Sequence, residues 1–114
     1  MQQSRIIIRN LSDVIPLKTS HNIGLKSVLL SNEETISNIT QIAYFELKEG
    51  EKADSHIHQT MDEHYLFISG KGIMCVDNEE IECKEGVFVL VPAKSSHSLE
   101  AISNLKFIAI GVAL

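Results

Sequence analysis

The chain has 114 residues, which is the size of a single domain, so we expect one hydrophobic core and one site. A composition with 44% hydrophobic and 22% charged residues is typical of a folded globular protein and excludes a disordered chain. Ten Lys and Arg against fifteen Asp and Glu leave a formal charge of −5, which disfavours nucleic acid as a partner.

The apolar stretches are short. Residues 87–91 and 107–114 fall well below the roughly 20 residues that a membrane-spanning helix needs. Three isoleucines near the N-terminus are too few for the apolar region of a secretory signal. We therefore expect a cytoplasmic protein that does not bind membranes. Cys75 and Cys83 are expected to be free thiols, because two cysteines make no disulfide framework in a reducing compartment.

Short segments rich in Ile, Val, Phe and Tyr recur along the chain, and turn residues separate them. In the less regular segment 11–32, residues 25–30 are the one candidate strand. The other expected strands cover residues 36–47, 63–68, 72–76, 80–83, 87–91 and 105–112. No segment carries a helical stripe. This pattern predicts an all-β protein built as an antiparallel sandwich or barrel.

Two histidines, His56 and His58, lie one residue apart in the segment 50–70. Alternate side chains of an extended strand share one face, so both imidazoles can point to the same place. The four residues that follow are enough to turn the chain and bring Glu63 beside the rings. His97, after a proline turn, offers a third imidazole. Three neutral imidazoles and one carboxylate suit Fe(II), Mn(II), Ni(II), Zn(II) or Cu(II).

Other assignments of these polar residues stay open. The two neighbouring histidines also fit a solvated loop, because metal ligation needs a third and a fourth partner. Asp62 is a competing carboxylate ligand if the loop is tighter by one residue. His64 faces the other way in a regular strand, so we expect it at the surface or at an interface. His21 is expected in a loop, not as a fifth ligand.

The spacing of residues 50–70 resembles the first motif of the cupin superfamily at every required position. The matching residues are Gly50, His56, His58, Glu63 and Gly70, separated as that motif requires. The motif is specific. Together with a second motif, which follows it in the chain, it covers about half of the sequence.

Residues 86–101 resemble the second cupin motif less completely. Gly86, Pro92 and His97 fall in place, whereas Lys94 replaces a glycine and Ala101 replaces an asparagine. These departures predict a somewhat different turn ahead of His97 and the loss of a structural hydrogen bond. The fifteen residues between the motifs match the short spacer of small single-domain bacterial cupins.

The resemblance implies a double-stranded β-helix, or jelly-roll barrel, as a single domain over residues 1–114. It also implies one divalent transition metal ion (Fe, Mn, Ni, Zn or Cu) near the centre of the barrel. The implied ligands are His56, His58, Glu63 and His97.

Aromatic residues are expected to line the site. Tyr65 and Phe67 share the parity of Glu63 and should project into the barrel, as core residues, as a wall beside the metal, or as both. On the preceding strand, the apolar alternation that includes Phe45 fits the lining better than the one that includes Tyr44. Tyr65, Phe67 and Phe45 are therefore the candidate substrate-binding residues, and the sequence assigns no catalytic residue.

Cationic side chains are scarce in the expected barrel. Both arginines precede residue 10, so no later strand offers the guanidinium that commonly binds a carboxylate or phosphate. Lys48, Lys52, Lys71 and Lys94 are expected in solvated turns. These observations favour a small ligand that is neutral or moderately polar.

We expect a metal-dependent enzyme, of the dioxygenase or isomerase type that the resemblance implies. The alternative is a non-catalytic cupin that binds a metal or a small ligand. A metal-free sugar epimerase ranks third, because that branch calls for a His–Asp pair and basic groups in the pocket. The segment 5–9 could add a strand to a neighbouring subunit, as in the homodimers common among small cupins, or form an edge strand of its own chain.

Overall fold

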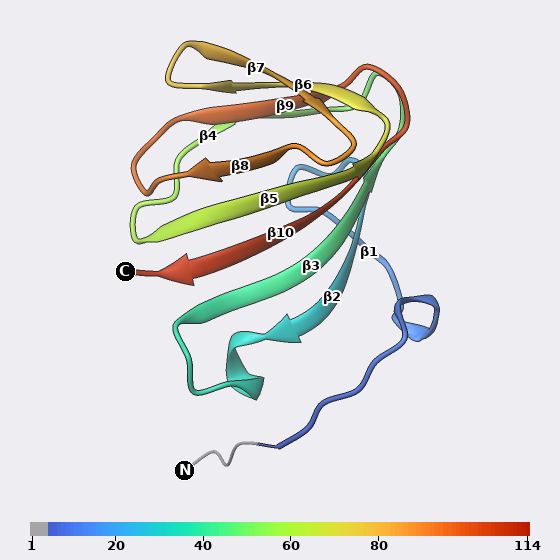
Figure 1. Cartoon of the computed structure of the whole chain (residues 1–114), viewed down its shortest axis with the longest axis vertical. Helices are drawn as coiled ribbons and strands as arrows, with labels where there is room; N and C mark the ends of the chain where they lie inside the picture. The colour runs from blue at the N-terminus through green and yellow to red at the C-terminus, as the bar shows by residue number, and fades with distance from the viewer. Residues whose placement is uncertain (1–4) are drawn as a thin grey trace.

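The structure is a computed structural model that describes residues 5–114, and it consists of two antiparallel β-sheets that face each other (Figure 1). The larger sheet has the strand order β1-β2-β3-β10-β5-β8, and the smaller has the order β4-β9-β6-β7. The predicted all-β jelly-roll fold is confirmed.

The strand bounds follow the sequence pattern closely, apart from three strands that it did not indicate. The larger sheet contains β1 (Leu17–Lys18), β2 (Leu25–Ser31), β3 (Ile39–Leu47), β5 (Met61–Ser69), β8 (Phe88–Val91) and β10 (Leu105–Ala113). The smaller sheet contains β4 (Lys52–His56), β6 (Lys71–Val76), β7 (Glu79–Lys84) and β9 (His97–Ala101). Two short 3-10 helices cover Leu11–Asp13 and Asn32–Glu34. Within residues 5–114, no helix is long and apolar enough to cross a membrane.

The core lies between the sheets, where alternate residues of β3, β10 and β5 point inward. Phe107 of β10 pairs with Phe45 on one side and with Phe67 on the other. The rings of Phe45 and Phe107 stack with centroids 5.0 Å apart. Ala43 and Phe67 are almost fully buried, so the expected inward alternation of β3 and β5 is confirmed. Each buried aromatic side chain of this kind stabilises the fold by about 1.5–3 kcal/mol.

The strands β4 and β9, like the two-residue strand β1, were not among the predicted strands. They pair with each other in the smaller sheet. Polar side chains outnumber apolar ones in both segments, since only Ala53, Leu99 and Ala101 provide apolar contacts. Strands of this composition give no clear alternation of apolar and polar residues, which is why the sequence did not indicate them.

The segment 5–9 forms no strand with the rest of the chain, so the expected alternative of an internal edge strand is wrong. The arm leaves the sheets on the side of β2 (Figure 1). It is attached through Arg9, whose guanidinium donates to the Leu29 carbonyl over 2.7 Å and pairs with Glu34. Ile6 and Ile8 are 87% and 88% exposed.

Both cysteines are free thiols, as predicted. Cys83 is fully buried on β7, and this burial raises the pKa of its thiol to about 11. Cys75 is half-buried.

Candidate metal centre

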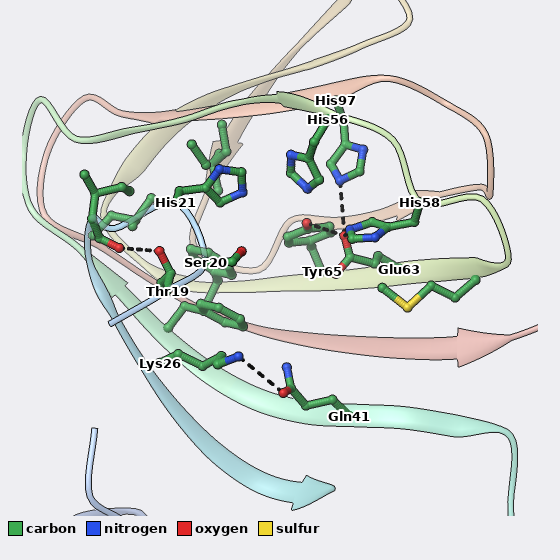
Figure 2. A pocket seen from close by; sticks show the side chains of 17 residues that line it. Thr19, Ser20, His21, Lys26, Gln41, His56, His58, Glu63, Tyr65 and His97 are labelled. Atoms are coloured by element: carbon green, nitrogen blue, oxygen red, sulfur yellow. Dashed lines mark hydrogen bonds and ion pairs between the residues drawn. The ribbon is translucent and has the colours of Figure 1, made fainter. Parts of the chain in front are cut away.

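The four predicted ligand residues converge from both sheets. His56 ends β4, His58 lies in the loop that follows, Glu63 belongs to β5, and His97 begins β9. The register of β4 and β9 pairs His56 directly with His97. Glu63 reaches the same place from the larger sheet (Figure 2).

The four side chains lie close enough together to share a single metal ion. Each residue offers one ligand atom, and these atoms all lie within 4.8 Å of one another. Oε1 of Glu63 is 3.1 Å from Nε2 of His58 and 3.1 Å from Nε2 of His97. Two ligand atoms bound to one transition metal at about 2.1 Å lie about 3 to 4 Å apart. Both the donor set and its geometry therefore make this group a candidate metal site.

Backbone carbonyls orient two of the imidazoles. Nδ1 of His56 is 2.9 Å from the Asp54 carbonyl, and Nδ1 of His97 is 3.2 Å from the Ser95 carbonyl. A carbonyl only accepts hydrogen bonds, so these contacts place a proton on Nδ1 and leave the lone pair of Nε2 for a metal. His97 is also held by packing, with 3% of its side chain exposed.

The surroundings of His56 and Glu63 favour the protonation states that bind a metal. Burial lowers the pKa of His56, which favours the neutral imidazole that a metal requires. Burial by itself raises the pKa of Glu63, but the contact with the imidazole of His97 and the hydrogen bond from Tyr65 outweigh it, and the net pKa lies below the ordinary value. Glu63 is therefore a carboxylate at neutral pH.

Neighbouring polar residues have other contacts. Oδ1 of Asp62 accepts a 2.8 Å hydrogen bond from the Ala93 backbone N–H, so the competing carboxylate lies outside the four-residue group. His64 faces away from the site and lies near Phe88, with ring centroids 6.0 Å apart. His21, in the loop before β2, contacts His56 at a centroid distance of 4.6 Å without belonging to the group.

The turn ahead of His97 carries the residue that replaces a motif glycine. Lys94 has a φ of +74°, in the left-handed region that glycine adopts without strain. Its backbone N–H donates to the His58 carbonyl over 2.7 Å. The turn therefore holds the loop of His58 against the start of β9. At the other departure, Ala101 is buried, and its backbone bonds with Gly50 and Glu51 at 2.8 and 2.9 Å.

A cavity of about 350 Å³ borders the candidate ligands. Phe45, Tyr65 and Phe107 contribute its aromatic wall. Phe67 does not line it; this side chain is in the core beside Tyr65, with ring centroids 6.1 Å apart. Lys48, Lys52, Lys71 and Lys94 are exposed, as expected, although Lys52 and Lys71 begin the strands β4 and β6 and do not lie in turns.

Polar residues that the sequence analysis did not single out line the cavity on the side of β2 and β3. They are Thr19, Ser20, Lys26 and Gln41. The candidate strand 25–30 contained Lys26, but a lysine in a strand ordinarily indicates the solvent face, so its inward position had no signal in the sequence.

Comparisons with known proteins agree with the fold described above. The cupin domain family matches residues 43–111. An uncharacterized protein of Methanocaldococcus jannaschii is 39% identical over 56 residues, which are 49% of this chain and 45% of that protein. The chain thus matches less than half the length of this curated relative.

Solved structures with the same arrangement of strands have low sequence identity. A predicted oxalate decarboxylase from Thermotoga maritima superposes with a TM-score of 0.88 at 23% identity, over 95% of this chain and all of the other. Ectoine synthase from P. lautus gives 0.83 at 16% identity, over 95% and 78%. The polyketide cyclase RemF from Streptomyces resistomycificus gives 0.82 at 11% identity, over 95% and 80%. At such identities the likeness establishes the fold alone.

Proposed function

This chain belongs to the cupin domain family, and on that premise we propose that it is a metal-dependent enzyme acting on a small molecule inside the barrel. The observation that carries the proposal is the group of four ligand atoms, within 4.8 Å of one another, at the wall of a cavity. His56, His58, Glu63 and His97 would hold one divalent transition metal. When bound, such a metal supplies Lewis-acid or redox chemistry.

Residues around the candidate ligands position the carboxylate and form the wall of the cavity. Tyr65 donates a hydrogen bond to Glu63 and so fixes the position of the carboxylate. Phe45, Phe107 and Leu99 give the cavity an apolar wall that excludes water from much of a bound ligand. A volume of about 350 Å³ is at the small end of the range for ligand pockets. The proposed substrate is therefore a small molecule.

Dioxygenase and isomerase activities both agree with this donor set, since the same ligands serve several reactions on one fold. A non-catalytic cupin that holds a metal or a small ligand is the alternative. The small number of titratable side chains in the cavity wall favours this alternative. Among residues 5–114, His21 and Lys26 are the titratable lining residues besides Tyr65 and the four candidate ligands.

Metal analysis of purified and reconstituted protein tests the first part of the proposal. We expect one transition metal per chain in the wild type and little in the double variant His56→Ala/His58→Ala. His64→Ala is the matched control, because this histidine lies on the outer face of β5. A wild type that retains no metal after reconstitution, or a double variant that retains it fully, would remove the metal site.

Activity measurements separate the enzyme from the binding module. Protein reconstituted with Fe(II) is incubated with phenols, diketones and flavonols while oxygen consumption is recorded, and isomerised products are sought by NMR. Turnover that the double variant lacks supports the enzyme. Metal-loaded protein that binds small molecules but converts none of them supports the non-catalytic alternative.

We also propose that the protein is a homodimer. The outer faces of β5 and β8 expose Leu66, Ile68, Phe88 and Leu90, and the arm exposes Ile6 and Ile8. Exposed apolar side chains clustered on adjacent strands are typical of a protein interface.

A further inference from the structure

One lysine enters the cavity. Lys26 of β2 pairs with Phe45 of β3, and cross-strand partners project from the same face of a sheet. Phe45 lines the cavity, and Lys26 lines it as well. Lys26 is half-buried, whereas Lys48, Lys52, Lys71 and Lys94 are exposed. Lys26 thus differs from these four solvated lysines.

The lysine is held in place by an amide. Nζ of Lys26 donates to Oε1 of Gln41 at 3.4 Å (Figure 2). An ammonium has three donors and a glutamine amide has two N–H donors of its own, so the pair presents donors beyond those used in this contact. Among the residues that the structure describes, Lys26 pairs with no carboxylate.

The lysine and the candidate metal ligands occupy different parts of one cavity. Lys26 and Gln41 belong to β2 and β3 of the larger sheet, whereas His56 and His97 belong to the smaller sheet. In Figure 2 the two groups lie on opposite sides of the space. The stacked rings of Phe45 and Phe107 contribute apolar surface to the same cavity.

A ligand that fills this cavity meets two electrostatically different ends. A partly buried ammonium is best compensated by an anion, and a carboxylate can accept from the ammonium and from an amide N–H together. We propose that Lys26 and Gln41 form a carboxylate subsite and that the substrate is a small organic acid, which binds the metal through a second oxygen group. This inference rests on the proposed function for the metal end only. A small organic acid replaces the neutral or moderately polar ligand that the positions of the arginines favoured.

Binding of matched ligands tests the subsite without any activity measurement. Zn(II)-loaded protein is titrated calorimetrically with linear dicarboxylates of two to six carbons and with the monoamide of each. We expect the wild type to bind at least one dicarboxylate about tenfold more tightly than its monoamide, because one charge-assisted contact is lost in the amide. In Lys26→Met this preference should disappear, so that the dicarboxylate and its monoamide bind about equally tightly.

Three further variants isolate the charge of Lys26. Lys84→Met removes an equal charge from an exposed position on β7 and should keep the tenfold preference. Lys26→Arg should restore much of the preference that Lys26→Met loses. Gln41→Glu places a carboxylate against the ammonium, so it should weaken dicarboxylate binding without lowering the thermal midpoint. Reduced binding in that variant is then separate from unfolding.

Each outcome decides the inference. Equal preferences in the wild type and Lys26→Met, no preference in the wild type, or no binding of any dicarboxylate would overturn it. Metal content is measured on the same samples and should be unchanged in Lys26→Met. If the wild type holds no Zn(II), the proposed function fails, and the same titrations of metal-free wild type and Lys26→Met test the subsite alone.

Discussion

The hydroxyl of Tyr65 donates a hydrogen bond of 2.9 Å to Oε1 of Glu63, and both side chains leave β5 on the same face. Oε1 is also the oxygen that lies 3.1 Å from His58 and from His97. Burial, and then the neighbouring Glu63, raise the pKa of Tyr65 well above its ordinary value. The phenol therefore remains a donor over the working pH range and fixes the carboxylate that faces the candidate metal.

Replacing Tyr65 by Phe should weaken metal binding about tenfold, because residues that orient a ligand typically contribute this much to metal affinity. The measurement is competition for Zn(II) with a chelator of known affinity. Tyr44→Phe is the control, since Tyr44 pairs with Ser27 and Ile108 on the other face of β3. Equal affinities of the two variants would contradict the orienting role of Tyr65.

Two adjacent carboxylates should respond differently to loss of charge. Glu63→Gln should lose metal, because the amide replaces the anionic ligand. Asp62→Asn should keep metal but lower the free energy of unfolding by about 1 kcal/mol, because the Ala93 N–H exchanges a charged acceptor for a neutral one. Metal analysis and urea unfolding check both results. Metal loss in Asp62→Asn alone would make Asp62 the ligand.

Glycine at position 94 should stabilise the turn ahead of His97. A non-glycine residue in the left-handed region is strained by roughly 1–2 kcal/mol, and glycine removes this strain. Part of that gain is offset because glycine has greater conformational freedom in the unfolded chain. Lys94→Gly should therefore raise the free energy of unfolding by about 0.5–1 kcal/mol. Lys52→Gly, in the exposed strand β4, should lower it. Urea unfolding of both variants decides, and a destabilised Lys94→Gly protein would contradict the argument.

Alkaline pH should destabilise the protein partly through Cys83. Burial raises the pKa of this thiol from 9.0 to about 11, so between these values the unfolded chain has lost a proton that the folded chain retains. The contribution of this thiol to the free energy of unfolding is fully present below pH 9. It decreases as the pH rises toward 11, by up to about 2 kcal/mol. Cys83→Ala should show a shallower loss than the wild type in urea unfolding. Cys75→Ala should follow the wild type; identical slopes for both variants would argue against the shift.

The proposed homodimer should depend on the outer face of β5 and β8. Phe88 is 59% exposed and pairs with Leu66, which is 45% exposed. A lysine at position 88 would place a charge within this apolar surface, so Phe88→Lys should give monomers in size-exclusion chromatography with light scattering. Glu82→Lys on β7 adds a lysine at an exposed polar position and should leave the mass unchanged. A wild-type protein that is monomeric at high concentration would refute the dimer.

The sequence was most informative where side-chain chemistry and spacing coincide. The positions of His56, His58, Glu63 and His97 predicted a group that the fold brings together. The sequence could not decide whether Asp62 or Glu63 is the carboxylate ligand. That depends on the contact between Asp62 and the Ala93 N–H, thirty-one positions away in the chain. The inward position of Lys26 likewise depends on the register of β2 against β3, which no local pattern determines.

The strand β4 lies at the edge of the smaller sheet and pairs only with β9 there. Its residues are mostly polar, so little apolar burial holds it in place. Because His56 terminates this strand and Glu63 comes from the opposite layer, a shared cation would tether the edge of one layer to the other. Local separation of β4 from the opposite sheet would then require release of the ion, so metal binding would stabilise this edge of the barrel against opening.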